Sequence, residues 1–371
     1  MGVNVVKLED IANVDYGTRV VKSKVEGDEY PVYGGGGETF RINKYNREHC
    51  VVVSRFAMSP KCTRYVNEKI FLNDSGLTVS TKDNSLLLQE YLDWYLLSKN
   101  DEIYSLGRGA GQRNLEIPSF KRMLISYPTD LEEQRKIISQ LKLADEIRAK
   151  KKLANDKLDE FLKSTFISMF GDPIINNKHL PTYNISKIGT VITGNTPSRK
   201  IEKYYGDYIE WIKSDNINTP YTYLTQATEY LSEEGAEVGR IVPSDSILVT
   251  CIAGSFDCVG NIALTNRSVA FNQQINAIVP NNNIVDSKFL YTQLHTGKKL
   301  IQDKSTKSMK GMVSKGKFET IKVIVPDLSE QKRFVEIFNN VEAQKKKNEL
   351  VIEQMNNLFN SLSQRAFKGE L

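Results

Sequence analysis

The chain has 371 residues, of which 40% are hydrophobic and 26% charged, a balance typical of a folded protein with room for two domains. No apolar run approaches the roughly 18 residues that a membrane helix needs, and the first residues lack the pattern of a secretory signal. We therefore expect a cytoplasmic protein without a membrane partner. The net charge of +5 permits nucleic-acid binding without requiring it, so the distribution of charge must decide.

The cysteines and histidines give little sign of a metal site. Cys50, Cys62, Cys251 and Cys258 form no CxxC pair, and a chain that relied on disulfides would be richer in cysteine. His49, next to Cys50, could share a metal with Cys62, but zinc ligands are usually paired more tightly along the chain. We expect free thiols and no metal.

The most informative feature of the sequence is an internal repeat. Residues 131–170 align without a gap on residues 328–367, since 131 + 197 = 328. The shared positions are Leu131, Glu133, Gln134, Leu153, Ser164 and Phe170, which fall on Leu328, Glu330, Gln331, Leu350, Ser361 and Phe367. Two long helical segments with this correspondence indicate duplication.

The repeat extends upstream of these segments. The matched stretches are 116–130 with 316–327 and 6–18 with 183–195, which place Phe120 on Phe318, Pro128 on Pro326 and Gly17 on Gly194. Fainter matches pair VVVSRF at 51–56 with ILVTCI at 247–252, and FLNDS at 71–75 with FNQQI at 271–275. The predicted layout is a variable domain at 1–130, a helix at 131–171, a second variable domain at 172–327 and a helix at 328–371.

Both long segments lack Pro and Gly and are rich in good helix formers. Asp130 and Asp327 are placed to cap them. A helix of this length spans about 60 Å at 1.5 Å per residue. Residues spaced by four and three form stripes that are apolar at the ends and polar in the middle, around Arg148 and Lys345. This predicts an antiparallel coiled coil whose polar middle fixes register or accepts a partner. The alternative is that each helix packs on its own domain as ordinary core.

The variable domains have a different texture, with short β-rich runs between turns rich in Gly, Asn, Ser and Asp. Helices are expected near 86–100 and 286–300. The predicted fold class is α+β, with two tandem-repeated α+β domains separated by two long helices in a pseudo-twofold arrangement.

Three loop regions are candidates for ligand contact. In YGGGGETF at 33–40, Gly35 and Gly36 would let the backbone approach phosphates or base edges, although the same glycines suit a mobile turn. The other two are loops without acidic residues at matching places of the repeat, 105–115 and 304–318. Their candidate DNA-binding residues are Arg108, Gln112 and Arg113 in the first, and Lys307, Lys310 and Lys315 in the second.

The residue types in these two loops suit nucleic acid. Arginine matches guanine and glutamine matches adenine in bidentate contacts, and lysine-rich loops suit phosphates. The alternative is that both loops are charged and exposed to solvent but bind no ligand. The stretch GMVSKGKF at 311–318 approximates a phosphate-binding loop, but Phe318 replaces the hydroxyl that would hold Mg²⁺, so no nucleotide site is expected.

The duplicated pattern EIPSFKRMLISYP…LEEQRKI and KGKFETIKVIVP…LSEQKRF resembles the specificity subunits of type I restriction–modification enzymes. FISMFGDP, the terminal SLSQRAFKGEL, and the stretches YPVYGGGG, TGNTPS and WIKSDNIN are similar to that family as well. The last two stretches add candidate contacts at 195–199 and 213–216, namely Asn195, Thr196, Ser198, Arg199, Lys213 and Asn216.

The resemblance implies a non-catalytic, DNA-binding subunit in which each variable domain is a target recognition domain for one half of a bipartite site on double-stranded DNA. It also implies docking of two methyltransferase subunits and of restriction subunits. S-adenosylmethionine, ATP and Mg²⁺ would be bound by those partners, and this chain would need no cofactor of its own. The absence of the Asn-Pro-Pro-Tyr and Asp-Pro-Pro-Tyr tetrapeptides of adenine methyltransferases agrees with that division of labour.

The paired helices would then act as a ruler, so that an insertion near residue 150 lengthens the unread spacer. Two rival interpretations remain. A nuclease or a fused methyltransferase would need motifs that the sequence lacks. A coiled-coil scaffold that binds only proteins would show no sequence preference on DNA, and the acid-free basic loops count against it.

Overall fold

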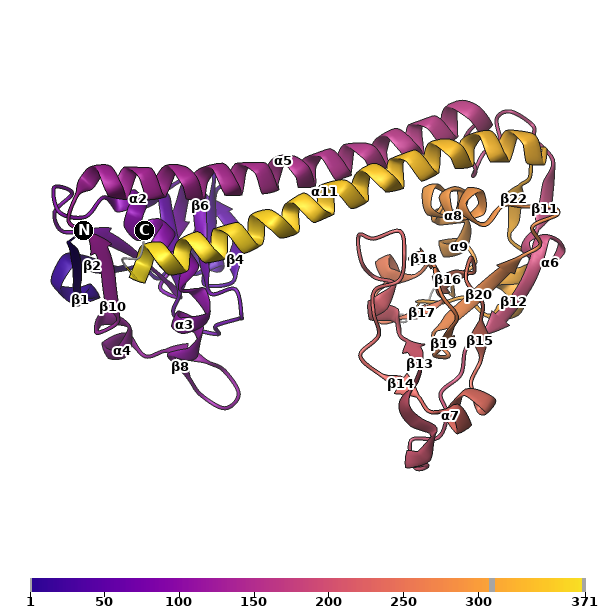
Figure 1. Cartoon of the computed structure of the whole chain (residues 1–371), viewed down its shortest axis with the longest axis horizontal. Helices are drawn as coiled ribbons and strands as arrows, with labels where there is room; N and C mark the ends of the chain where they lie inside the picture. The colour runs from indigo at the N-terminus through magenta and orange to yellow at the C-terminus, as the bar shows by residue number, and fades with distance from the viewer. Residues whose placement is uncertain (1, 307–310, 369–371) are drawn as a thin grey trace. The chain divides into compact units, whose positions relative to one another are not determined.

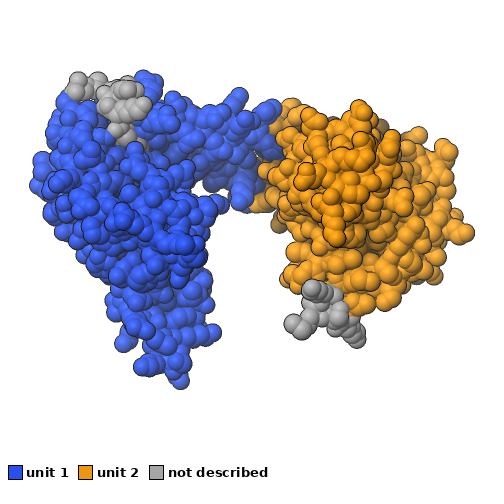
Figure 2. Space-filling model, turned by 90° about the horizontal axis from the view of Figure 1, so that it is seen from below, with its two compact units in different colours: residues 1–153, 348–371 blue, residues 154–347 orange. Residues whose placement is uncertain are grey.

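The computed structural model describes residues 2–306 and 311–368, and the chain divides into two compact units. Unit 1 comprises residues 1–153 and 348–371, and unit 2 comprises residues 154–347 (Figure 2). Each unit contains sheets, short helices and one portion of each long helix, α5 (Leu131–Phe170) and α11 (Leu328–Lys368) (Figure 1). The α+β content and the two long helices confirm the predicted fold class.

Unit 1 is built on a six-stranded sheet in the order β2-β7-β5-β6-β3-β4. Its strands are β2 (Ala12–Tyr16), β7 (Gly76–Thr81), β5 (Arg47–Ser54), β6 (Thr63–Leu72), β3 (Tyr30–Gly34) and β4 (Gly37–Ile42). Two further antiparallel pairs are β1 (Val3–Lys7) with β10 (Leu124–Pro128) and β8 (Gly107–Arg108) with β9 (Asn114–Leu115). The helices are α1 (Leu8–Ile11), α2 (Gln89–Ser98), α3 (Asn100–Ser105), α4 (Ile117–Lys121) and the 3₁₀ turn Lys22–Lys24.

Unit 2 has two four-stranded sheets, in the orders β12-β20-β16-β18 and β14-β13-β19-β15. Their strands are β12 (Gly189–Thr193), β20 (Ile275–Pro280), β16 (Ile247–Thr250), β18 (Ile262–Leu264), β14 (Tyr230–Leu231), β13 (Tyr205–Ile212), β19 (Val269–Phe271) and β15 (Ile241–Val242). The pairs β11 (Thr182–Asn184) with β22 (Lys322–Ile324) and β17 (Ile252–Ala253) with β21 (Gly311–Met312) complete it.

The helices of unit 2 are short, apart from its portions of α5 and α11. They are α6 (Ile185–Ile188), α7 (Glu233–Val238), α8 (Ser287–Thr296), α9 (Lys299–Gln302), α10 (Lys315–Glu319) and the 3₁₀ turns Glu202–Tyr204, Ser214–Asn216 and Phe256–Cys258. The helices expected near 86–100 and 286–300 are therefore present as α2 with the start of α3, and as α8 with the start of α9. In both regions the helix breaks once.

The hydrogen-bonding registers of the two units correspond residue by residue. In unit 1, Val53 of β5 lies opposite Leu77 of β7, and in unit 2, Val249 of β16 lies opposite Asn276 of β20. The prediction that 51–56 and 247–252 are equivalent is confirmed, because each stretch begins in an inner strand of its sheet, β5 or β16, in the same register and continues past the end of that strand.

The predicted match of 71–75 with 271–275 is wrong by one residue. The Gly17 amide donates to the Gly76 carbonyl (3.1 Å), whereas the Gly194 amide donates to the Ile275 carbonyl (3.0 Å). Residue 76 therefore corresponds to residue 275, an offset of 199 rather than 200. The register is set by Asn73 and Asn272, whose side-chain oxygens each accept a hydrogen bond from the amide two residues later. It is not set by the match of Phe71 with Phe271 that the sequence suggested.

Gly17 and Gly194 are needed for close approach of two segments. A Cβ at Gly17 would lie 1.9 Å from the Asn73 carbonyl oxygen, and one at Gly194 would lie 2.1 Å from that of Asn272. Neither position can accept a side chain without moving the backbone. The sequence match between these glycines thus identifies the same turn in both units.

A buried glutamine ties each long helix to its own unit. Gln134 is fully buried; its Oε1 accepts from the Leu88 amide (2.9 Å) and its Nε2 donates to the Leu86 and Pro128 carbonyls (both 2.9 Å). At the equivalent position in unit 2, Gln331 Oε1 accepts from the Asp286 amide (2.8 Å), and Nε2 donates to the carbonyls of Ile284 (3.1 Å) and Pro326 (2.7 Å). One side chain therefore satisfies three main-chain groups in each unit.

The long helices meet antiparallel within each unit. In unit 1, Arg148 of α5 donates to Asn356 Oδ1 of α11 (3.1 Å), and in unit 2, Lys345 of α11 donates to Asp159 Oδ1 of α5 (2.8 Å). Because 148 + 197 = 345 and 159 + 197 = 356, the two contacts are the same contact with the helices exchanged. The polar middle of the stripes thus makes the polar contacts between the helices.

The start of α5 is capped as expected, since Asp130 Oδ1 accepts from the Glu132 amide (2.9 Å). Among the residues with described positions, no helix is both long and apolar enough to cross a membrane.

Candidate nucleic-acid interface

In unit 1 several loops converge at the end of the main sheet, around Ser75. The Gly35 amide donates to Ser75 Oγ (3.0 Å), and the Arg55 amide donates to the Ser75 carbonyl (2.8 Å). The Leu115 amide in turn donates to the Arg55 carbonyl (2.8 Å). We call this set, residues 17–19, 34–37, 55–58, 73–76 and 107–115, the loop edge of unit 1.

The two candidate glycines of unit 1 have different environments. Gly35 is buried, and its carbonyl accepts from Ser54 Oγ (2.6 Å) and from the guanidinium of Arg64 (2.8 Å). Gly36 is exposed, and apart from its two chain neighbours nothing lies within 4 Å of the position a Cβ would take. Gly35 therefore fastens the turn to the sheet, and Gly36 is the residue that an approaching ligand would meet.

The hairpin loop between β8 and β9 carries the three candidates of residues 105–115. Arg108 has a side chain that is 77% exposed and forms an ion pair with Glu116 (3.0 Å). Arg113 is half-buried: its guanidinium donates to the Gly107 carbonyl (2.9 Å) and lies 4.6 Å from the ring centre of Tyr104. Arg113 thus closes the loop, whereas Arg108 and the exposed Gln112 project from it.

Unit 2 has the same convergence of loops. The Cys251 amide donates to the Gln274 carbonyl (2.8 Å), and the Val313 amide donates to the Cys251 carbonyl (2.8 Å). These bonds repeat those made by Arg55, Ser75 and Leu115. We call residues 194–199, 213–216, 251–254, 272–275, 304–306 and 311–315 the loop edge of unit 2.

Two candidate segments found separately in the sequence occupy equivalent places. The Asn73 amide donates to the Tyr33 carbonyl (2.9 Å), and the Asn272 amide donates to the Ile212 carbonyl (3.0 Å). The glycine turn that follows Tyr33 therefore corresponds to the segment that follows Ile212, which begins with Lys213. The structure brings both segments to the loop edge of their unit.

The candidates at 195–199 include residues that build the turn. Asn195 Nδ2 donates to the Val238 carbonyl (2.8 Å) and its Oδ1 accepts from the Arg240 amide (2.9 Å). Thr196 donates through its hydroxyl to Gln273 Oε1. Ser198 is exposed. Asn195 therefore positions the segment, and Thr196 and Ser198 lie on its surface.

Arg199 and Lys213 share one carboxylate, that of Glu229. Arg199 forms an ion pair with Glu229 Oε2 (2.5 Å), and Lys213 pairs with Oε1 of the same residue. The guanidinium of Arg199 also lies 4.4 Å from the ring centre of Tyr205 and 5.0 Å from that of Trp211. The hydrogen bond from Lys213, then that from Arg199, lower the pKa of Glu229. The result is a pre-oriented pair of cations beside an aromatic surface.

The remaining candidates have other positions. Asn216 is buried and holds its loop, with Oδ1 accepting from the Lys213 amide (3.0 Å) and Nδ2 donating to the Gln226 carbonyl (3.0 Å). Lys315 is exposed on the first turn of α10, which Ser314 caps, rather than in a loop as the sequence suggested. Lys307 and Lys310 lie outside the described residues.

Sequence reasoning missed two cations at the loop edge of unit 1. Arg55 lies between two rings, 4.8 Å from the centre of Tyr16 and 4.5 Å from that of Phe56. Arg19 is exposed two residues after Gly17, the place that Thr196 takes after Gly194. The repeat alignment ends one residue before Arg19 and Thr196, so extending it by one position would have found Arg19, whereas Arg55 lies at the end of a strand-like run.

The loop edges present cations and hydrogen-bond donors. Over the described ranges 2–306 and 311–368, no group of three or more His, Cys, Asp or Glu side chains could hold a metal ion. Burial raises the pKa of the Cys62 thiol to about 11 and that of Cys251 to about 12, so both stay protonated near neutral pH. The arrangement is suited to binding a polyanion.

Comparison with known proteins gives the family. A family model described as the type I restriction modification DNA specificity domain matches residues 1–158 and 177–354, one match for each repeat. The chain belongs to this family.

Individual relatives agree with this assignment. Over 169 residues the chain is 32% identical to the type I restriction enzyme HindI specificity subunit of Haemophilus influenzae, covering 42% of this chain and 34% of that protein. It is 24% identical over 339 residues to the EcoR124I/EcoR124II specificity subunit of Escherichia coli, covering 86% of this chain and 81% of that protein. The chain thus spans only about a third of the first relative.

Two solved structures share the fold. A type I restriction–modification S subunit from M. genitalium superposes with a TM-score of 0.59 at 18% identity, covering 99% of this chain and 96% of that one. A chain from a study of assembly and conformational transition of the type I R-M system superposes with a TM-score of 0.55 at 15% identity, covering 100% and 98%.

Proposed function

We propose that this chain is the DNA specificity subunit of a type I restriction–modification complex and that it has no catalytic role. Each unit would bind one half of a bipartite site on double-stranded DNA through its loop edge. The observation that carries the proposal is the repeated frame with unlike loops: Gln134 and Gln331, or Gly17 and Gly194, do the same work, while the side chains at the two loop edges differ.

Charge supports DNA as the ligand of both loop edges. The hairpin at 105–115 and the segment 304–318 contain no acidic residue. Exposed arginines such as Arg108 and Arg199 can donate two hydrogen bonds to a guanine edge or to a phosphate. Different donors at the two edges would select different bases, so the two half-sites need not be alike.

The partners in this proposal supply the chemistry. Two methyltransferase subunits would bind S-adenosylmethionine, and restriction subunits would bind ATP and Mg²⁺. The chain would place them by binding DNA and by docking them, so its own residues orient the complex without moving a proton or forming a bond. A cytoplasmic location follows from this role.

The long helices would set the distance between the two half-sites. Inserting one turn near residue 150 of α5, with a matching turn near residue 347 of α11, should lengthen the unread spacer while leaving both half-sites unchanged. The contacts Arg148–Asn356 and Lys345–Asp159 would keep the helices in register on either side of the insertion. An unchanged spacer in this variant would overturn the ruler.

The proposed function is tested by sequencing the methylome of cells that express this chain with its methyltransferase subunit. We expect methyladenine in one split motif, lost when the chain is omitted. Methylation without a split motif, or methylation that does not depend on the chain, would contradict the assignment and favour a protein-binding scaffold.

A further inference from the structure

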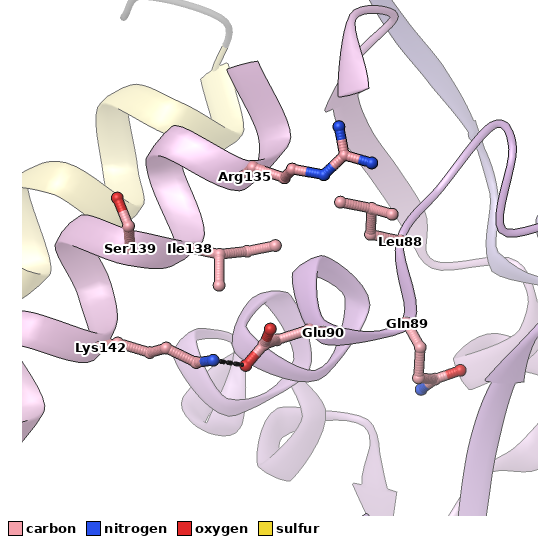
Figure 3. A pocket seen from close by; sticks show the side chains of 7 residues that line it. All are labelled: Leu88, Gln89, Glu90, Arg135, Ile138, Ser139 and Lys142. Atoms are coloured by element: carbon pink, nitrogen blue, oxygen red, sulfur yellow. Dashed lines mark ion pairs between the residues drawn. The ribbon is translucent and has the colours of Figure 1, made fainter. Parts of the chain in front are cut away.

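Unit 1 contains a cavity of about 740 Å³ between β6, α2, α5 and the end of α11. It is lined by Tyr65, Asp93, Trp94, Arg148 and Phe359, among others. A smaller pocket of about 440 Å³ shares Gln89, Glu90 and Lys142 with it, and Figure 3 shows Glu90 of α2 and Lys142 of α5 paired across it. The two hollows form one groove along α2, which we call the α2 groove.

The corresponding place in unit 2 is filled by the chain itself. Tyr223 forms a parallel bridge with Leu264 of β18: the Leu264 amide donates to the Thr222 carbonyl (2.9 Å), and the Leu224 amide donates to the Leu264 carbonyl (3.1 Å). The segment 222–224 thus adds a short extended stretch to the edge of the sheet.

Side chains of this inserted segment reach the long helices. Thr222 Oγ1 donates to Glu342 Oε1 (2.8 Å) and accepts from Lys345 Nζ (3.4 Å). Tyr291 of α8 is buried and hydrogen bonded to Thr222. The insert therefore completes the contact between sheet, α8 and α11 in unit 2.

In unit 1 the same strand edge is open. Tyr65 corresponds to Leu264, because Val51 pairs with Tyr65 as the equivalent Ile247 pairs with Leu264. On its other side, β6 pairs with β3 only at Phe71 and Leu72, so within the described residues no strand covers Tyr65. The α2 groove lies where unit 2 has its insert.

The floor of the groove also differs in charge. Asp93 takes the place of Tyr291, since Leu88 and Asp286 make the same bond to Gln134 and Gln331 and start the equivalent helices. Asp93 is 7% exposed, and its Oδ1 accepts from Gln89 Nε2 (2.8 Å). No cation among the described residues forms an ion pair with it. A buried carboxylate of this kind is costly unless a donor or cation reaches it.

From these observations we propose that the α2 groove binds an extended peptide segment of a partner subunit, which adds to the edge of β6 at Tyr65 and places a lysine or arginine against Asp93. The occupant is a polypeptide because unit 2 fills the same edge with its own chain. It is cationic because Asp93 replaces the neutral Tyr291. That the peptide belongs to a subunit of the same complex rests on the proposed function. That the groove binds a cationic extended peptide does not.

The test uses the full chain and a synthetic peptide of residues 219–228 in which lysine replaces Thr222, so that the chain's own insert is the template. We expect saturable binding by fluorescence anisotropy and slower hydrogen exchange of the amides at 64–67. Asp93→Asn keeps the shape and should weaken binding about tenfold, to the level of the unmodified peptide. Asp93→Tyr should abolish it by filling the groove.

Two controls sharpen the result. A scrambled lysine peptide should not bind, and Glu160→Gln, which removes an exposed carboxylate of unit 2, should leave binding unchanged. Absence of binding by the unaltered chain, or equal binding by the Asp93→Asn variant, would overturn the proposal. Since no DNA is present, failure here would leave the proposed function untouched.

Discussion

Units 1 and 2 share a frame and differ at their loop edges. Gln134 and Gln331 each satisfy three main-chain groups, whereas Arg108 on its hairpin and Arg199 beside Glu229 have no such correspondence. The residues named here that hold backbone geometry are identical in the two units, whereas the cations exposed at the two loop edges are not. With this division, the same backbone frame carries a different set of exposed side chains in each unit.

The frame itself is not uniform, and the middle of the long helices shows this. Lys345 has a side chain only 7% exposed and contacts both Asp159 and Glu342, while its equivalent, Arg148, is 32% exposed and contacts Asp145, Asn356 and the ring of Phe359. The same position forms a buried ion pair in unit 2 and a partly exposed ion pair in unit 1. The inserted segment 222–224, which covers Lys345, accounts for the difference.

The largest expected effect comes from the glutamines. Gln134→Leu leaves the Leu88 amide and two carbonyls buried without partners, so unit 1 should lose about 3–5 kcal/mol of unfolding free energy. Gln331→Leu should cost unit 2 a similar amount. Hydrogen exchange resolved by unit after each substitution measures both, and a loss confined to one of the two variants would break the equivalence.

The next effect should be asymmetric. Lys345→Met leaves Asp159 and Glu342 without their cation and should cost about 3 kcal/mol, whereas Arg148→Met, in the more open position, should cost about 1 kcal/mol or less. Burial alone would lower the pKa of Lys345, but Glu342 and Asp159 raise it above its ordinary value, so the lysine is charged at all working pH. Chemical denaturation of the two variants compares them, and equal losses would contradict the difference in burial.

Asp93 predicts a stability change that depends on pH. Burial raises its pKa to about 6, above the ordinary value of 3.8, so the folded chain retains a proton that the unfolded chain has released. Its contribution to the free energy of unfolding therefore falls as pH rises from about 4 to about 6. Asp93→Asn should stabilise unit 1 by up to about 3 kcal/mol at pH 7 and have little effect near pH 4.

Urea denaturation at the two pH values measures this effect, with the exposed Asp28→Asn as a matched control. An Asp93→Asn variant with the same stability difference at both pH values would show that the carboxylate is not titrating as described.

The smallest effect is expected for one exposed arginine. Arg108→Ala should weaken binding to the cognate DNA about tenfold, a loss of about 1–2 kcal/mol, with no change in unfolding free energy. The matched variant Arg113→Ala removes a side chain tied to the Gly107 carbonyl, so it should also loosen the hairpin. Titration of DNA at several salt concentrations, alongside thermal unfolding, separates the two; a drop in unfolding temperature for Arg108→Ala would refute its surface role.

Much of the fold could be predicted from the sequence because the chain contains the same series of elements twice. The long helices, the cap at Asp130 and the match of Gly17 with Gly194 follow from local signals and a constant offset. The role of Gln134 could not be predicted, because its side chain bonds to the main-chain amide of Leu88, which lies 46 residues away in the sequence.

The candidate site was predictable only as a set of segments. Sequence patterns selected the glycine turn and the hairpin of unit 1 and the segments 195–199, 213–216 and 304–318 of unit 2, but not the other segments of the loop edges. They could not tell which polar side chains point outward. Asn216 and Arg113 form hydrogen bonds that stabilise their own loops. Arg55 lies at the end of a strand, where the sequence has no residues typical of a loop. The open edge at Tyr65 was equally invisible, because it depends on an insert that only unit 2 possesses.

Reading of one half-site by each unit is tested most directly by altering one loop edge and determining both half-sites. Arg108 and Gln112 are both replaced by alanine, and the methylome is sequenced in cells that also supply the methyltransferase subunit. We expect relaxed base preference in one half of the split motif, with the other half and the spacer unchanged. Loss of preference in both halves together, or an unaltered motif, would contradict the claim that each unit reads its own half-site.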